Sequence, residues 1–244
     1  MFALAGRTAV VTGASSGLGA RFAVVLAEAG ATVFAAARRV DRVKAMAAGD
    51  HRIRPVACDV SVAEDREALV GTAVAETGRL DVLVNNAGAP GATRAEDESA
   101  DEFSKVLDVN LVAPFHLAKL ATTAGATSIV NVASILGIVS AAPLGGAGYA
   151  ASKAGLIGLT RELAGQWGAA GVRVNALAPG WFRSEMTEDL FADERSGRWV
   201  ARNTMLGRGG EGTELDGALL FLASDASSYT TGQVLVVDGG WTAR

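Results

Sequence analysis

Hydrophobic residues occur in short, nearly continuous runs, separated by longer stretches in which apolar positions have a helical spacing. Seven runs rich in Val, Ile, Leu and Ala predict strands near positions 8, 31, 52, 81, 128, 172 and 233. Because apolar residues in these runs do not alternate with polar ones, helices are expected to cover both faces of each strand, as in parallel sheets. Helices are predicted over 18–29, 62–76, 101–123 and 150–167.

Strands that alternate with helices predict an α/β fold, with three layers in a doubly wound, Rossmann-like arrangement around a seven-stranded parallel sheet. No linker, repeat or low-complexity tract divides the chain, so residues 1–244 are expected to form one domain. The acidic run at 95–102 is interpreted as the solvated start of a helix.

A glycine-rich segment, TGASSGLG at 12–19, lies between the first predicted strand and the first predicted helix. Glycine lets the backbone approach a pyrophosphate closely, and free N–H groups at a helix N-terminus stabilise the phosphate charge. A tight turn without a ligand is the alternative. The segment predicts a dinucleotide site that contains Gly13, Ser15, Ser16, Gly17, Leu18 and Gly19.

The second predicted strand ends in two arginines, Arg38 and Arg39. Folds that bind NAD place a carboxylate at this point to bind the ribose, whereas a nearby arginine accommodates the 2′-phosphate of NADP. Asp41 lies past this position. We therefore expect NADP(H) to be preferred, with NAD(H) possible; a solvated arginine pair without a ligand is the alternative.

Five further motifs follow along the chain. They are Asp59-Val60, Asn85-Asn86-Ala87-Gly88, Asn110, Ser134 and the segment YAASK at 149–153. Together with TGASSGLG, their order and spacing resemble the short-chain dehydrogenase/reductase family over essentially the whole chain. The resemblance implies transfer of a hydride between a nicotinamide cofactor and a carbonyl or alcohol, as in the 3-oxoacyl-[acyl-carrier-protein] reductases.

The resemblance also implies cofactor contacts beyond the glycine-rich segment. Asp59 would hold the adenine amino group with Val60 beside it, although Asp59 could instead cap the helix predicted at 62. Ser184 stands where the family often has a threonine that contacts the carboxamide. The other implied contacts are Asn86, Ala87, Gly88, Pro179, Gly180 and Phe182.

Tyr149 and Lys153 stand four residues apart in a predicted helix, so they share one face of it. Ketone reduction leaves negative charge on oxygen, and an acid must supply a proton. A phenol has a reference pKa of about 10, so a neighbouring ammonium would favour its phenolate. Tyr149 is therefore expected to be the catalytic acid and base; a surface pair without a catalytic role is the alternative.

Ser134, at the end of the fifth predicted strand, is expected to donate to the substrate oxygen. The resemblance implies that Lys153 also bonds the nicotinamide ribose and that Asn110 bonds a water behind Lys153, completing a proton relay. Ser134 precedes Tyr149 by fifteen positions, slightly more than is usual in the family. The glycine-rich segment between them is expected to loop out the excess, and Ser140 is the competing candidate.

The segment after the sixth predicted strand, approximately 181–206, is expected to be a lid over the substrate. Its apolar side chains indicate a hydrophobic or aromatic carbonyl substrate, although each can instead pack the lid on the body or on a neighbouring subunit. They are Trp181, Phe182, Met186, Leu190, Phe191, Trp199 and Met205.

Composition narrows the function classes. The chain is 50% hydrophobic and 20% charged with a net charge of −4, which indicates a soluble globular protein without bias toward nucleic acid or anionic membrane. Cys58 is the only cysteine, so no internal disulfide forms and the cytoplasm is the expected location. His51 and His116 belong to no ligand-spaced cluster, so no metal site is predicted.

The leading hypothesis is an NADP-dependent ketone or 3-oxoacyl reductase that works reversibly as an alcohol dehydrogenase. An NAD-dependent hydroxysteroid or polyol dehydrogenase is the alternative among enzymes, and a non-catalytic NADP-binding redox sensor is the alternative outside them. The resemblance implies a homotetramer in which the helices near 101–123 and 150–167 pair across one interface.

Overall fold

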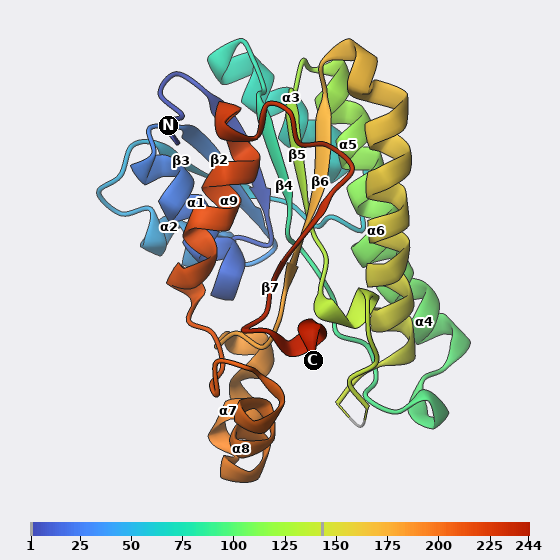
Figure 1. Cartoon of the computed structure of the whole chain (residues 1–244). Coiled ribbons are helices and arrows are strands. Elements are labelled where there is room, and N and C mark those ends of the chain that lie inside the picture. The colour runs from blue at the N-terminus through green and yellow to red at the C-terminus, as the bar shows by residue number, and fades with distance from the viewer. Residues whose placement is uncertain (1, 143) are drawn as a thin grey trace.

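A computed structural model describes residues 2–142 and 144–244, in which strands and helices alternate (Figure 1). The strands of these residues are β1 (Thr8–Thr12), β2 (Thr32–Ala37), β3 (Ile53–Ala57), β4 (Val82–Asn85), β5 (Ser128–Val132), β6 (Arg173–Pro179) and β7 (Val234–Val237). The helices of the same ranges are α1 (Gly17–Glu28), α2 (Val40–Met46), α3 (Ala63–Thr77), α4 (Ala100–Leu107), α5 (Ala113–Thr123), α6 (Ala147–Trp167), α7 (Glu188–Ala192), α8 (Glu194–Asn203) and α9 (Asp216–Ala223). Every predicted strand is confirmed.

The strands form one parallel sheet in the order β3-β2-β1-β4-β5-β6-β7. The sheet grows outward from β1 in one direction as far as β3, and the chain then returns to place β4 on the other side of β1. Such a switch point opens a crevice at the carboxyl ends of the two central strands, where α/β folds bind ligands. The predicted fold class is therefore confirmed.

Helices cover both faces of the sheet. Figure 1 shows α1 and α9 on one face, and α3, α5 and α6 on the other. Phe22 and Leu219 belong to the apolar core on the first side, and Leu69 and Leu117 to the core on the second. All five residues of β1 are buried, which explains why the central strands are continuously apolar.

The single helix expected over 101–123 is interrupted. α4 ends at Leu107, a π-helical turn spans Asp108–Val112, and α5 begins at Ala113. Pro114 follows directly and has no N–H to donate, so it is suited to the first turn of a new helix. Such π turns often occur at functional sites, and this one carries the buried Asn110.

The last part of the acidic run begins α4, as predicted, whereas Ala95–Asp97 forms a separate 3-10 turn. Ser99 accepts a hydrogen bond from the Glu102 amide, and the Glu102 carboxylate accepts one from the Ser99 amide, which together form a capping box. The prediction omitted α2, α7, α8 and α9.

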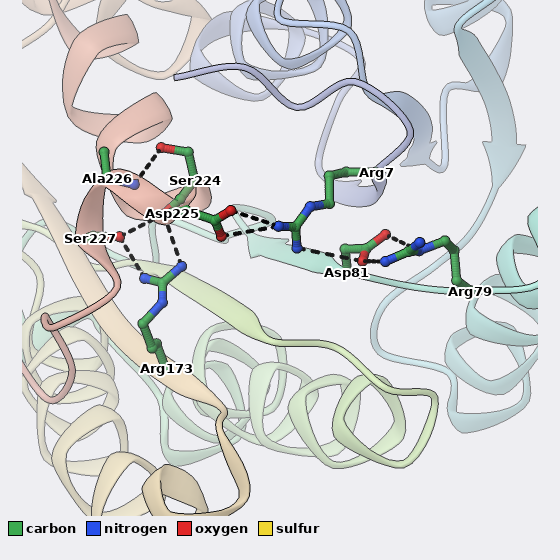
Figure 2. Close-up of polar contacts among 8 residues, drawn as sticks. All are labelled: Arg7, Arg79, Asp81, Arg173, Ser224, Asp225, Ala226 and Ser227. Atoms are coloured by element: carbon green, nitrogen blue, oxygen red, sulfur yellow. Dashed lines mark hydrogen bonds and ion pairs between the residues drawn. The ribbon is translucent and has the colours of Figure 1, made fainter. Parts of the chain in front are cut away.

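The amino end of the sheet contains a network of paired charges, shown in Figure 2. Asp81, which is 2% exposed, accepts hydrogen bonds from the Thr8 amide and the Arg79 guanidinium. Arg7 lies between Asp81, at 3.7 Å, and Asp225, at 3.0 Å. These contacts tie the starts of β1 and β4 to the turn after α9.

The helices α7 and α8 project beyond the opposite, carboxyl end of the sheet (Figure 1). They lie within the segment predicted to be the lid. Among the described residues, none of the helices is long and apolar enough to cross a membrane.

Candidate active site

The glycine-rich turn between β1 and α1 depends on glycine at two positions. Gly13 has φ of +69°, and a Cβ there would lie 2.8 Å from the Ala87 Cα. A Cβ at Gly19 would lie 2.3 Å from the Gly13 carbonyl oxygen. Side chains would therefore force β1, β4 and α1 apart at the point where the crevice opens.

The N-terminus of α1 has the features of a phosphate site. Ser16 is the N-cap residue, but its side chain makes no capping hydrogen bond, and the first turn contains no acidic residue. The N–H groups of this turn and the positive end of the helix dipole are thus available to an anion.

The carboxyl ends of β1 and β4 are joined by polar contacts. The Thr12 hydroxyl accepts hydrogen bonds from the Asn86 and Ala87 amides, both at 3.0 Å. The Asn86 side chain donates to the Thr12 carbonyl at 2.9 Å. Asn85 contributes to the structure instead, because its side-chain amide donates to Pro114 and Asn131.

Asp59 lines the crevice beyond β3. Its carboxylate accepts hydrogen bonds from the Ser61 amide and hydroxyl, which together lower its pKa, and the charge of Arg38 lowers it further. The helix-capping alternative does not hold, because α3 begins at Ala63 with Val62 as its N-cap residue. Asp59 and Val60 both face the crevice.

The two arginines after β2 have different surroundings. Arg38 is exposed and forms no hydrogen bond or ion pair with the described residues. Arg39 forms an ion pair with Glu185 of the lid, with distances of 2.9 and 2.6 Å, and donates to the Ser16 hydroxyl at 3.0 Å. Glu185 is not among the residues predicted for the cofactor site.

Tyr149, Lys153 and Ser134 meet at the carboxyl end of β5. Tyr149 and Lys153 lie one turn apart on α6, with the Lys153 Nζ 5.5 Å from the centre of the Tyr149 ring. Lys153 is buried and donates to the Val132 carbonyl at 2.8 Å. The Ser134 hydroxyl accepts a hydrogen bond from the Leu136 amide at 3.1 Å and lines the same cleft as the Tyr149 phenol.

Ser134 is favoured over Ser140 by position. Ser140 is exposed and accepts a hydrogen bond from the Ala142 amide, while Ser134 faces the crevice. Between Ser134 and Tyr149 the chain forms a 3-10 turn at Ile135–Gly137, and the Leu144 amide donates to the Ala141 carbonyl at 2.9 Å. Pro143, within the expected loop, lies outside the described residues.

The pKa of Tyr149 is not lowered by Lys153 in the way that the sequence predicts. The charge of Lys153 was expected to favour the phenolate, but burial raises the pKa of Tyr149, and the nearby Ser134 hydroxyl opposes that rise. Burial also lowers the pKa of Lys153 to about 8. Desolvation disfavours both charged forms, so the protein groups alone do not produce the acidic phenol.

Asn110 lies behind these groups rather than in the crevice. It is fully buried, accepts from the Ala89 amide at 2.8 Å, and donates to the Ala89 carbonyl and the Ser152 hydroxyl. These bonds fix the turn after β4 against α6. A Cβ at Gly88 would contact both the Asn110 Oδ1 and the Lys153 Nζ, so the three groups adjoin.

These elements enclose a cleft of about 500 Å³, within the usual range of ligand sites. The predicted residues brought together in its lining are Gly13, Ser15, Ser16, Gly17, Leu18, Gly19, Arg38, Arg39, Asp59, Val60, Asn86, Ala87, Gly88, Ser134, Tyr149, Lys153, Pro179, Gly180, Phe182 and Ser184. The glycine turn and the uncapped helix N-terminus fit the pyrophosphate of a dinucleotide cofactor.

A second cavity, of about 270 Å³, adjoins the cleft at Ser134 and Tyr149. Trp181, Met186 and Leu190 of the predicted lid line it together with Ile135. Other lid residues pack elsewhere. Trp199 contacts Trp181 and Trp241, Phe191 stacks on Arg183, and Met205 is 61% exposed.

No group of three or more His, Cys, Asp or Glu side chains in the described ranges could hold a metal ion. His116 instead accepts a hydrogen bond from Arg66 at 3.0 Å. Burial raises the pKa of the Cys58 thiol to about 11, which makes it a poor nucleophile.

Comparison with known proteins agrees with this arrangement. A family model described as enoyl-(acyl carrier protein) reductase matches residues 13–242. Cis-4-hydroxycyclohexanecarboxylate dehydrogenase of Sinomonas cyclohexanicum is 41% identical, over 99% of this chain and 98% of the relative.

Solved structures are similar over the whole length. A short-chain type dehydrogenase/reductase from Mycobacterium marinum has a TM-score of 0.92 and 35% identity, covering 100% of this chain and 98% of that one. A gluconate 5-dehydrogenase from Burkholderia cenocepacia, in complex with NADP and tartrate, has a TM-score of 0.92, 32% identity and the same coverage. The chain belongs to the short-chain dehydrogenase/reductase family and is an NAD(P)-dependent oxidoreductase acting on hydroxyl or carbonyl substrates.

Proposed function

We propose that this enzyme prefers NADP(H) and interconverts a hydrophobic ketone, 3-oxoacyl compounds included, with the corresponding secondary alcohol. One observation carries the proposal. Ser134 and Tyr149 lie where the dinucleotide cleft meets an apolar cavity, with Lys153 on the cleft side. A carbonyl group at that junction would reach a hydrogen-bond donor and a proton source together.

When bound, the nicotinamide supplies or accepts the hydride. The Ser134 hydroxyl donates to the carbonyl oxygen and orients it, and the Tyr149 phenol transfers a proton to that oxygen as negative charge develops. Lys153, held by the Val132 carbonyl, places its ammonium beside the phenolate that forms. In the direction of alcohol oxidation, Tyr149 accepts the proton.

The positive charge that makes the phenol sufficiently acidic is proposed to come from two sources. Lys153 is one, and the oxidised nicotinamide is the other. The side-chain oxygen of Asn110 has two lone pairs, of which the Ala89 amide uses one. The second lone pair can bind the water of the proposed relay behind Lys153.

The preference for NADP(H) is supported by the unpaired Arg38. A planar guanidinium binds a phosphate through two parallel hydrogen bonds, and Arg38 has no competing partner among the described residues. Asp59, whose pKa the charge of Arg38 lowers, already accepts two hydrogen bonds from Ser61.

The hydrophobic substrate is supported by the lining of the second cavity. None of its described lining residues is charged, and aromatic or aliphatic side chains dominate its lid side. The carboxylate of a sugar acid such as gluconate, on which the Burkholderia relative acts, would find no cation there. The side-chain hydroxyls that the described lining offers a polyol are those of Thr93, Ser134, Tyr149 and Thr187. The substrate named for the Sinomonas relative has a ring that suits an apolar lining, but its carboxylate would likewise find no cation there.

A redox sensor without catalysis is the rival from another class. A sensor needs the dinucleotide cleft but has no use for Ser134, Tyr149 and Lys153 at the mouth of a second cavity. We therefore propose that residues 1–244 act as one catalytic domain, with the lid at approximately 181–206. The single cysteine, Cys58, supports the proposed location in the cytoplasm.

A homotetramer is proposed from the family resemblance and from exposed apolar surface. Val112 and Phe115, on the helical segment after α4, are 48% and 45% exposed. All four residues of β7, at the edge of the sheet, are only partly buried. Such surfaces commonly mark contacts between subunits, and a monomeric mass by light scattering would exclude the assembly.

The proposal is tested by measuring cofactor oxidation with NADPH and NADH in parallel against aliphatic, aryl, steroidal and 3-oxoacyl ketones. Faster turnover with NADPH and a hydrophobic ketone is expected. Faster turnover with NADH would support the NAD-dependent alternative. Binding of either cofactor without turnover of any ketone would favour the sensor.

A further inference from the structure

Glu185 of the lid forms ion pairs with Arg39 and Arg42, at the end of the cleft where the 2′-phosphate of NADP(H) is proposed to bind. Its carboxylate accepts two hydrogen bonds from Arg39, at 2.9 and 2.6 Å, and one from Arg42 at 2.9 Å. Hydrogen bonds from Arg39 and Arg42, with the Ser16 hydroxyl nearby, hold the pKa of Glu185 far below its ordinary value. The ion pairs therefore join the start of the lid, after β6, to the segment that follows β2.

The same arginines adjoin Arg38, which has no partner within the described part of the chain. Arg38, Arg39 and Glu185 all line one cleft, and Arg42 reaches it through Glu185. A phosphate monoester carries about −1.5 to −2 charges and three acceptor oxygens, against one charge on a carboxylate. It is therefore the stronger partner for this cluster of guanidinium groups.

The ion pairs of Glu185 can be displaced at little cost. Glu185 and Arg39 are 43% and 47% exposed, and exposed pairs contribute little to stability because water and salt screen them. They still engage guanidinium N–H groups of Arg39 and Arg42 that a phosphate would also bind.

Glu185 also links this end of the cleft to the substrate cavity. The next two residues, Met186 and Thr187, line both the cleft and the cavity. The Thr187 hydroxyl bonds Ser184 and donates to the Phe182 carbonyl, which makes the start of the lid one connected unit. A shift of Glu185 away from Arg39 would therefore move part of the cavity wall.

We infer that Glu185 is a cofactor-selectivity residue, which holds Arg39 and Arg42 until the 2′-phosphate of NADP(H) displaces it and releases the start of the lid. This inference rests on the proposed use of NADP(H). A cofactor without the phosphate leaves the ion pairs in place. Glu185 thus makes release of the lid depend on the phosphate that distinguishes the two cofactors.

The inference is tested with nucleotides that lack the nicotinamide. Isothermal titration calorimetry would compare adenosine 2′,5′-bisphosphate with adenosine 5′-monophosphate on the wild type, Glu185→Gln and Glu194→Gln. Glu194 is the matched control, because it is a lid carboxylate paired with an arginine, Arg198, at 2.9 Å and does not line the cleft. Glu185→Gln should bind the bisphosphate about two- to fivefold tighter, with the monophosphate unchanged, and Glu194→Gln should match the wild type.

Limited proteolysis gives a second readout that is independent of catalysis. In the wild type, the bisphosphate should accelerate tryptic cleavage after Arg195, Arg198 or Arg202, and the monophosphate should not. Glu185→Gln should be cleaved at the faster rate without any nucleotide, whereas Glu194→Gln should retain the wild-type response.

The outcomes separate this inference from the proposed function. A wild type that prefers the bisphosphate, with unchanged or weaker binding by Glu185→Gln, would overturn the role of Glu185 alone. A wild type that binds the two nucleotides equally would overturn the NADP preference and this inference together.

Discussion

The two ends of the β-sheet both contain buried ionisable groups, but only one end pairs them. At the amino end, the carboxylate of Asp81 is bonded by Arg79 and the Thr8 amide and lies near Arg7. At the carboxyl end, the Lys153 ammonium is buried with a single carbonyl partner and no carboxylate among its hydrogen-bond partners.

This difference separates stability from chemistry. Paired charges connect elements and keep their charged forms near neutral pH. A desolvated lysine and a desolvated phenol have shifted pKa values and can exchange protons. The amino end is therefore expected to determine the stability of the fold, and the carboxyl end to determine its activity.

The largest effect is expected from Tyr149→Phe. Loss of the phenol proton should lower kcat by about 10³-fold or more, because general acid catalysis typically contributes 10²–10⁴-fold. Binding of NADPH, followed by protein fluorescence, should change little because the ring is retained. Turnover close to the wild-type rate would show that another group supplies the proton.

At the opposite end, Asp81→Asn should weaken the fold without affecting turnover. The substitution leaves Arg79 and Arg7 without their shared carboxylate, and we expect a loss of about 2–3 kcal/mol in unfolding free energy. Urea unfolding measures the loss. A substantial decrease in kcat of the folded variant would contradict the division between the two ends.

Lys153→Met should lose activity but not stability at neutral pH. Burial lowers the pKa of Lys153 from 10.5 to about 8, so above pH 8 the folded state releases a proton that the unfolded state retains until about pH 10.5. Stability of the wild type from this group therefore rises between those pH values, by about 1–3 kcal/mol. The variant should lack that rise in urea unfolding, and an identical pH profile would contradict the buried, unpaired ammonium.

The smallest effect in this comparison of the two ends is expected from Arg38→Ala. Loss of a charge-assisted contact should raise the KM for NADPH by about tenfold and that for NADH by less than about twofold. Steady-state kinetics with both cofactors measures the difference. Equal effects on the two KM values would remove Arg38 from phosphate recognition.

Most of the fold could be predicted because the strands are buried on both faces. β1 and β5 are apolar runs with few polar interruptions, and such runs have few other possible structures in an α/β chain. The helix α9, DGALLFLA, was missed because its apolar residues do not form one stripe. The π-helical turn at Asp108–Val112 leaves no mark on the periodicity of 101–123.

The candidate site was predictable where it depends on local motifs. The glycine turn and the Tyr149–Lys153 spacing are properties of neighbouring residues. The contact of Arg39 with Glu185 joins positions 146 residues apart, and only the folded chain brings them together. The only sign of this contact in the sequence is that Glu185 directly follows Ser184, a position that the family resemblance had already assigned to the cofactor site.

The separation of the two ends is tested most directly by a double-mutant cycle of Tyr149→Phe and Asp81→Asn. Unfolding free energy and kcat would be measured for the wild type, both single variants and the double variant. Distant, independent sites should be additive within about 0.5 kcal/mol, so the double variant should have the stability of Asp81→Asn and the turnover of Tyr149→Phe. A coupling energy well above that value in either quantity would contradict the account.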